Sequence, residues 1–301
     1  MYNRRKFIGH SSLLGGFALL PWQKHLLSTF MEDAGSLTML RKNVWVYTER
    51  GGSIGVLLSD DGIAVVDTQF KAQSENLIAK IKEKSERKID LLINTHHHGD
   101  HTGGNIAFKG IIDQHVAHKN SKSNQERVAK ARKQEATQLY PDTVFDSSWS
   151  KKVGSEIITM HYFGPAHTDG DSITHFENAN IAHMGDLMFN RRFPFIDKSS
   201  GASIQGWIKV LSQAKKTFDK DTLFIFGHAG EGYEITGNLD DVKAFQNYLK
   251  KLWKFSSKAY KKGISQEELA KDLNFIPGAP EWKGGGLERS ISAAYLELEE
   301  K

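Results

Sequence analysis

Near the beginning of the chain, three short runs rich in apolar residues alternate with turn residues. These runs are residues 43–49, 53–60 and 62–68, with Gly51-Gly52 and Asp60-Asp61-Gly62 between them. Short β-rich runs are typical of β-strands, and short glycine-containing breaks between them are typical of hairpin turns. We therefore expect antiparallel hairpins in this part of the chain.

The spacing becomes helical in residues 71–86, where Leu77, Ile78 and Ile81 recur on one side. An apolar run at residues 89–95 then predicts a buried strand, and it leads directly into the polar segment "THHHGDHTGG". A strand, a helix, a second strand and a polar loop are the layout of an α/β site at the carboxyl end of a strand.

The second half repeats this mixture of elements. Residues 121–138 predict a charged, solvated helix, and residues 155–189 are rich in strand patterns. Helices are expected at 204–217 and 240–261, with a strand at 222–228 between them. A last helix has apolar residues on one side, which indicates core packing: Leu287, Ile291, Tyr295 and Leu298. We expect an α/β fold in which two packed β-sheets are flanked by helices.

Composition and charge exclude several classes of protein. The 301 residues contain 39% hydrophobic and 25% charged side chains, as in ordinary globular proteins. Half of the net charge of +4 comes from residues 1–33, so the remainder is close to neutral and no basic stripe points to nucleic acid. The sequence has no cysteine, which excludes thiolate ligands and a cysteine nucleophile.

The beginning of the chain resembles a twin-arginine signal peptide. Arg4-Arg5-Lys6-Phe7-Ile8 precede an apolar stretch at residues 13–22, which is too short to span a bilayer. We expect a leader at residues 1–33, a single domain at 34–301, and export to the periplasm. Without a lipobox cysteine, no lipid anchor is expected. The other interpretation is a simple basic tail.

Four segments carry residues of metal-binding type, each after a predicted strand. In the first, extended alternation places His96 and His98 on one side and His97 on the other, and Gly99 lets the chain turn toward a second point. The candidates beyond that turn and in the other three segments are Asp100, His101, His167, Asp186 and His228. Seven candidates are enough for two ions that share a bridging group. Imidazole and carboxylate suit Zn²⁺, and they also serve iron and manganese.

These motifs, in this order, resemble the metallo-β-lactamase-fold hydrolase superfamily. The resemblance covers residues 40–230, including the early "VVDT" run, and implies an αββα sandwich of two mixed β-sheets flanked by helices. It implies that His96, His98 and His167 hold one metal, that Asp100, His101 and His228 hold the other, and that Asp186 bridges them. Asp67 matches a position that orders the ligand loop.

Asp186 distinguishes this chain within the superfamily. The β-lactamases usually carry cysteine or serine there, whereas glyoxalase II-like members carry the bridging aspartate. The resemblance therefore implies a zinc-dependent hydrolase in which a hydroxide bridging two Zn²⁺ ions attacks the carbonyl of a small-molecule lactam, lactone, ester or thioester. Asp100 would orient the nucleophile and shuttle its proton. A phosphodiesterase with the same ligands and a non-catalytic periplasmic metal-binding protein are the alternatives.

Two further segments bear on the substrate. Residues 189–201 follow the bridging aspartate and contain three phenylalanines and two arginines. They form either a wall of the substrate site, with Arg191 or Arg192 as a carboxylate contact, or ordinary packing with solvated arginines. Residues 48–55 form a hairpin tip that either overhangs the site or makes a plain tight turn. The sequence leaves the substrate and the oligomeric state open.

Overall fold

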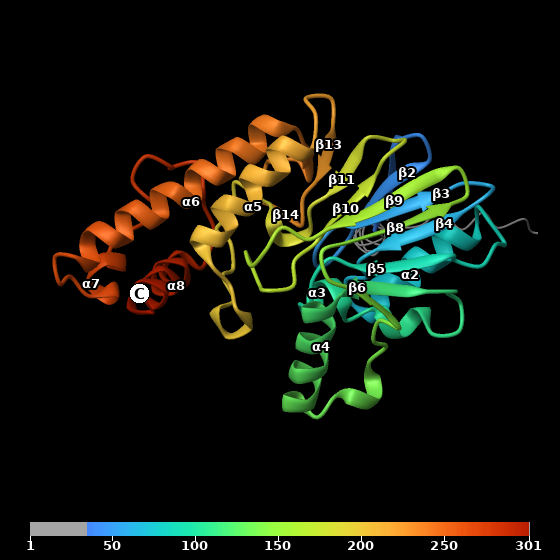
Figure 1. Ribbon diagram of the computed structural model, residues 1–301, viewed down its shortest axis with the longest axis horizontal. Helices are drawn as coiled ribbons and strands as arrows, with labels where there is room; N and C mark the ends of the chain where they lie inside the picture. The colour runs from blue at the N-terminus through green and yellow to red at the C-terminus, as the bar shows by residue number, and fades with distance from the viewer. Residues whose placement is uncertain (1–34, 301) are drawn as a thin grey trace, which may run out of the picture. The chain divides into compact units, whose positions relative to one another are not determined.

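The structure is a computed structural model that describes residues 35–300 (Figure 1). Its larger sheet contains seven strands that follow one another in chain order. They are β1 (Ser36–Arg41), β2 (Val44–Thr48), β3 (Ile54–Leu58), β4 (Ile63–Val66), β5 (Leu91–Asn94), β6 (His115–His118) and β7 (Thr143–Phe145). The first four pair antiparallel and the last four pair parallel.

The second sheet contains six strands in the order β15-β13-β11-β10-β9-β8. They are β8 (Ser148–Val153), β9 (Glu156–His161), β10 (Ile173–Phe176), β11 (Ile181–His183), β13 (Leu223–Ile225) and β15 (Thr236–Gly237). Only β11 and β13 pair in parallel. A separate short parallel pair joins β12 (Phe189–Asn190) to β14 (His228–Ala229).

Helices cover the outer faces of the two sheets. The longer ones are α2 (Lys71–Lys82), α4 (Lys119–Arg132), α5 (Ile204–Thr217), α6 (Leu239–Tyr260) and α8 (Leu287–Glu299). The shorter ones are α3 (Gly99–Thr102), α7 (Gln266–Ala270) and the 3₁₀ turns η1 (Asn105–Phe108), η2 (Glu135–Thr137), η3 (Gly185–Leu187) and η4 (Lys198–Ser200). In Figure 1, α5, α6 and α8 lie together on one side of the strands.

The alternation along β4 explains how the layers form. Ile63 and Val65 pack in one cluster with Leu77 of α2, whereas Ala64 and Val66 point into the core between the two sheets. A third cluster joins α5, α6 and α8 to the outer face of the second sheet, around Trp207. The order helix, sheet, sheet, helix confirms the expected αββα sandwich.

The structure differs from the expected elements in three details. The strand β1 was not predicted, and the expected helix at 121–138 begins earlier and ends at Arg132. It ends there because Lys133 has a left-handed backbone with φ of 56°. One side of α4 is also buried rather than solvated, since Gln125 and Ala129 are 6% and 4% exposed.

The expected leader at residues 1–33 lies outside the described residues, so it stays a prediction. Within residues 35–300, no helix combines the length and the apolar character needed to cross a bilayer.

Candidate metal centre

The candidate ligands lie where strands of both sheets end. His96 to His98 follow β5, and the helix α3 directly after them carries Asp100 and His101. Asp186 lies in η3 after β11. The strands β4 and β5 pair in parallel, as do β11 and β13, so their carboxyl ends deliver these residues to a common edge.

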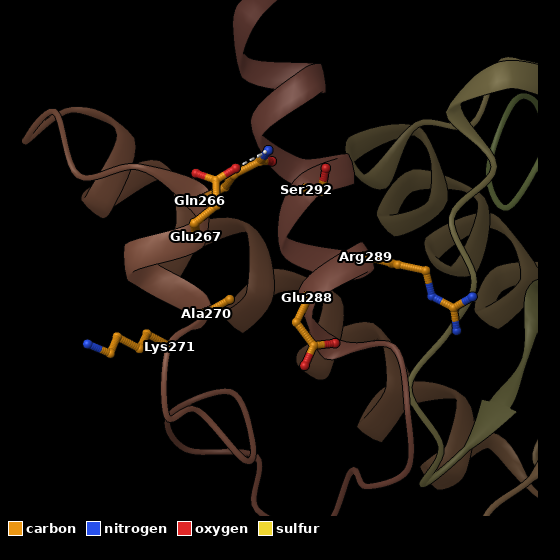
Figure 2. A pocket seen from close by; sticks show the side chains of 7 residues that line it. All are labelled: Gln266, Glu267, Ala270, Lys271, Glu288, Arg289 and Ser292. Atoms are coloured by element: carbon orange, nitrogen blue, oxygen red, sulfur yellow. Dashed lines mark hydrogen bonds between the residues drawn. The ribbon is translucent and has the colours of Figure 1, made fainter.

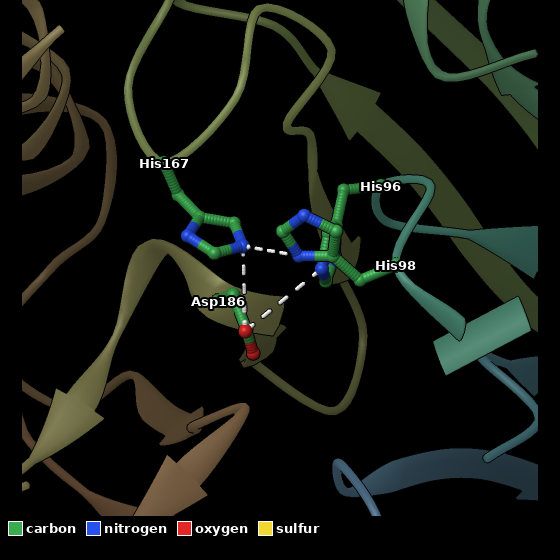
Figure 3. Close-up of side chains that lie close together, drawn as sticks. All are labelled: His96, His98, His167 and Asp186. Atoms are coloured by element: carbon green, nitrogen blue, oxygen red, sulfur yellow. Dashed lines mark hydrogen bonds and ion pairs between the residues drawn. The ribbon is translucent and has the colours of Figure 1, made fainter. Parts of the chain in front are cut away.

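The first group of donors faces one oxygen of Asp186. His167 Nε2 lies 3.4 Å and His96 Nε2 3.8 Å from Asp186 Oδ2. His98 completes the group, because its Nδ1 lies 2.8 Å from His167 Nε2. Figure 3 shows the three imidazoles converging on this carboxylate. The structure therefore brings together the four residues expected at the first metal.

The second group faces the other oxygen. His101 Nε2 lies 3.0 Å and His228 Nε2 3.4 Å from Asp186 Oδ1. Asp100 Oδ2 lies 3.1 Å from His228 Nε2 and 3.9 Å from His101 Nε2. One carboxylate is thus shared between two groups of three residues, which is the geometry of a bridging ligand.

The residues present fit two small cations. A tetrahedral ion with bonds of about 2.0 Å holds its ligand atoms roughly 3.3 Å apart, similar to the separations above. Nε2 of His96, Nε2 of His101 and Oδ1 of Asp186 are buried without an aligned hydrogen bond to any residue in 35–300. Buried polar atoms are normally paired, so a cation between the groups would satisfy them.

Hydrogen bonds on the far sides of the rings fix the imidazoles. Asp67 Oδ2 lies 2.8 Å from His101 Nδ1, and the other Asp67 oxygen accepts from the backbone nitrogen of Thr95 at 2.8 Å. The Phe195 carbonyl lies 2.7 Å from His167 Nδ1. Each contact leaves Nε2 of the ring directed at the centre. Asp67 thus lies where its expected role requires.

Asp197 makes a contact of the same kind that sequence reasoning missed. Its Oδ2 lies 3.1 Å from His98 Nε2 and 3.5 Å from His97 Nε2. His97 is buried beside Ser200 and belongs to none of the donor groups that contain Asp186, in agreement with the alternation argument. Asp197 belongs to the segment that we assigned to the substrate wall, and no spacing within that segment links it to His98.

Burial and neighbouring charges shift the pKa values of the imidazoles in different directions. Burial, followed by neighbouring His98, lowers the pKa of His167 to about 3, and burial together with His101 also lowers the pKa of His96. For His101, burial would lower the pKa, but the carboxylates of Asp186 and Asp67 outweigh it and raise the pKa well above its usual value. His96 and His167 are therefore neutral and ready to bind, whereas a cation must displace a proton from His101.

The two acids of the centre are ionised. Burial would raise the pKa of Asp186, yet the charges of His228 and His101 hold it well below its usual value. For Asp100, burial acts in the same direction but the hydrogen bond with His228 and the charge of His101 lower its pKa to about 2. Both carboxylates are thus available as ligands near neutral pH.

A cavity of about 300 Å³, which we call the metal cavity, opens onto the centre next to Asp100, Asp186 and His228. Phe189, Phe193 and Phe195 line it, as expected for a substrate wall, together with Arg192. A second cavity of about 260 Å³, under the hairpin tip, also includes Arg192 and His228.

Of the two expected arginines, only Arg192 borders these cavities. The guanidinium of Arg191 lies 4.8 Å from the ring centre of Trp282 and 3.6 Å from Asp241, so its contacts are structural. The expectation for Arg191 as a substrate contact is therefore not supported by its position.

Arg289 of α8 also lines the metal cavity, and no motif in the sequence points to it. Its guanidinium lies 5.8 Å from the ring centre of Phe195. Two contacts fix α8: Ser290 donates to the Pro194 carbonyl at 3.1 Å, and the Glu297 carboxylate accepts from the backbone at the start of α5. Only the tertiary packing of a distant helix brings this cation to the site.

Glycines let the chain approach the centre closely. A Cβ atom at Gly52, in the hairpin tip, would lie 2.1 Å from the His101 ring, and one at Gly104 would lie 2.1 Å from Ser74 Oγ. A Cβ at Gly99 would meet no described atom within 4 Å, and its φ is not positive. The chain does turn after His98, but the turn does not depend on glycine: α3 begins there with ordinary helical geometry.

Known proteins are similar to this chain in sequence. A family model described as the metallo-beta-lactamase superfamily matches residues 47–228. Metallo-beta-lactamase type 2 of Bacillus sp. (strain 170) is 23% identical over 206 residues, which cover 65% of this chain and 77% of that protein. The type 2 enzyme of Bacteroides fragilis is 23% identical over 217 residues, covering 68% and 83%.

Solved structures show the same fold. The metallo-beta-lactamase from Pontibacter korlensis has a TM-score of 0.56 at 17% identity and covers 72% of this chain and 99% of that one. A double mutant of the sec-alkyl sulfatase PisA1 has a TM-score of 0.69 at 13% identity and covers 88% of this chain, which spans half of the sulfatase. At these identities the likeness concerns the fold alone.

Proposed function

Because this chain belongs to the metallo-β-lactamase superfamily, we propose that it is a hydrolase with two divalent metal ions, zinc in the first instance, acting on a carbonyl of a small molecule. The bonds concerned are those of lactams, lactones, esters or thioesters. The observation that carries the proposal is the division of the two Asp186 oxygens between two groups of donors.

Two bound ions would supply an activated water at neutral pH and polarise the carbonyl to be attacked. The side chains of the chain account for the remaining requirements. Asp100 is ionised, borders the cavity and is about one-third exposed on its side chain, so it can orient a water and accept its proton. Phe189 and Phe193 line the cavity beside the metals and limit the access of bulk water.

The positive charge of the proposed centre and of the cavity wall favours substrates that carry a carboxylate. Two divalent cations with Asp100, Asp186 and one hydroxide leave a net charge of about +1 at the centre. Arg192 and Arg289 add two cations on the cavity wall. A β-lactam, or a lactone that opens to an alkoxide, meets this charge distribution. The β-lactamase relatives are a reason to include lactams in any substrate panel.

Metal content and a substrate panel test the proposal together. The purified protein should contain about two metals per chain by elemental analysis, and a chelator should abolish hydrolysis in a panel with a chromogenic cephalosporin, a lactone, a thioester and bis-nitrophenyl phosphate. Intact activity in the His101→Ala or Asp186→Ala variant would overturn the two-metal assignment. Turnover of the phosphodiester alone would select the alternative phosphodiesterase, and bound zinc without any turnover would select a binding protein.

The proposed place of action is the periplasm, reached through the twin-arginine segment. Fractionation of cells that express the full chain, compared with an Arg4→Lys and Arg5→Lys double variant, tests this. Retention of the variant in the cytoplasm supports export by this route, and an unchanged distribution contradicts it.

A further inference from the structure

A cavity of about 480 Å³ lies between α7 and α8, outside the metal centre (Figure 2). It exists because the facing side chains are small, Ala270 on α7 and Ser292 on α8. The longer side chains around it contribute mainly their methylene stems: Lys271 extends away from α8, and Gln266 donates a hydrogen bond to Glu267 at 3.0 Å. The surface offered to a ligand is therefore largely aliphatic.

Arg289 joins this cavity to the metal centre, because it lines both. Figure 2 shows its side chain extended away from the other labelled residues, toward the neighbouring ribbon. The stem of Arg289 thus borders the α7–α8 cavity, while its guanidinium lies against Phe195 in the wall of the metal cavity. Long basic side chains commonly present an apolar stem and a charged end to different surroundings.

Two large apolar side chains near Arg289 are exposed: Phe195 in the metal cavity, and Leu296 farther along the same face of α8. Phe195 is 42% exposed in the metal cavity, and Leu296 is 45% exposed. Arg289, Ser292 and Leu296 are spaced by three and four residues, so they share one face of α8. A large exposed apolar side chain that borders a cavity, as Phe195 does, is typical of surfaces that a ligand covers.

We propose that the metal cavity and the α7–α8 cavity are two parts of one cleft, which binds an amphiphilic substrate. The polar carbonyl end of this substrate lies at the metals and the Arg289 guanidinium, and an alkyl or acyl chain runs along the Arg289 stem into the α7–α8 cavity. The identity of the reacting end rests on the proposed function, whereas the chain site does not. A compact polar substrate would leave the second cavity unused.

Direct binding of simple carboxylates tests the chain site without any turnover. Butanoate, octanoate and dodecanoate, each below its micellar concentration, are titrated by calorimetry into the zinc-loaded protein. We expect affinity to rise about two- to fourfold for each methylene that the cavity covers. Ala270→Trp, which fills the cavity, should weaken dodecanoate binding at least about tenfold and leave butanoate unchanged. Glu299→Trp, at an exposed position of α8, serves as the matched control.

A second variant separates the two parts of the cleft. Arg289→Met keeps an aliphatic stem and removes the charge, so it should weaken all three carboxylates by a similar factor. Equal affinity of butanoate and dodecanoate in the wild type, or dodecanoate binding that is insensitive to Ala270→Trp, would overturn the proposal. If chain-length dependence is found but no ester, lactone or lactam is hydrolysed, the chain site stands and the proposed function fails.

Discussion

Asp67 Oδ2 lies 2.8 Å from Nδ1 of His101, on the side of the ring opposite to the metal centre. Both residues are fully buried. Asp67 has a left-handed backbone with φ of 67°, and its second oxygen holds the backbone of Thr95, so one carboxylate ties the end of β4 to the end of β5 and orients a ligand. This contact makes Asp67 a positioning residue for His101.

We expect Asp67→Ala to weaken the second metal by about 10- to 100-fold and to leave the first metal bound. The cause is loss of the acceptor that fixes the His101 tautomer. Asp67→Asn keeps an oxygen acceptor and should retain more of the affinity. Competition titrations with a zinc chelator measure both steps, with exposed Asp60→Ala as the control. Equal loss of both metals in Asp67→Ala would contradict this role.

The two acids at the centre should differ in their effect on metal content. Asp186→Ala removes the only carboxylate shared by both groups, so both metals should weaken. Asp100→Ala touches only the second group, so about one metal per chain should remain after dialysis. Elemental analysis of the two variants distinguishes these outcomes. Retention of two metals by Asp186→Ala would exclude a bridge through this residue.

The sequence predicts the ligands better than it predicts their surroundings. His96, His98 and His101 form one local motif after a strand, so short-range spacing is enough to identify them. Asp197 and Arg289 reach the centre only through the packing of a loop and of α8, and neither has a spacing that relates it to a ligand. The helix that begins at Gly99 has only four residues, so no repeat of apolar positions predicts it.

Gly52 and Gly99 provide a matched pair of substitutions. Gly52→Ala places a methyl group on the His101 ring, so we expect loss of the second metal and a fall in kcat of at least about tenfold. Gly99→Ala adds a methyl group in open space at the first residue of α3, where alanine favours the helix, so metal content should not change. Metal content and kcat of the two variants decide between these expectations. Normal metal content in Gly52→Ala would show that the hairpin tip yields to His101.

Substitution of Arg192 should affect substrate binding, whereas substitution of Arg191 should affect stability. Arg192→Ala removes a cation from the cavity wall, so KM for a carboxylate-bearing substrate should rise about tenfold with little change in unfolding. Arg191→Ala removes contacts with Trp282 and Asp241, so it should lower the free energy of unfolding by about 1 kcal/mol and leave KM unchanged. Steady-state kinetics and urea denaturation of both variants test this. The reverse pattern would assign the substrate contact to Arg191.

His115 should make stability depend on pH in a defined window. It is 1% exposed, its Nε2 donates to Asn94 Oδ1 at 2.8 Å, and burial lowers its pKa from 6.5 to about 4. Above pH 6.5 the His115 ring is neutral in both the folded and the unfolded chain, so its contribution to the free energy of unfolding is fully present. As the pH falls from 6.5 to about 4, only the unfolded chain binds the proton, so the free energy of unfolding decreases by up to about 3 kcal/mol. Below about pH 4 the folded chain binds the proton too, and His115 lowers the stability no further.

His115→Gln keeps a donor toward Asn94 but does not titrate, so it should remove this part of the pH dependence. We expect the loss of unfolding free energy between about pH 7 and about pH 5 to be smaller in the variant by about 2 kcal/mol. Urea denaturation of both proteins at each pH measures the difference. Since His115 is not among the candidate ligands, loss of metal at low pH affects both proteins alike and cancels. The same pH dependence in both proteins would show that His115 titrates normally in the folded state.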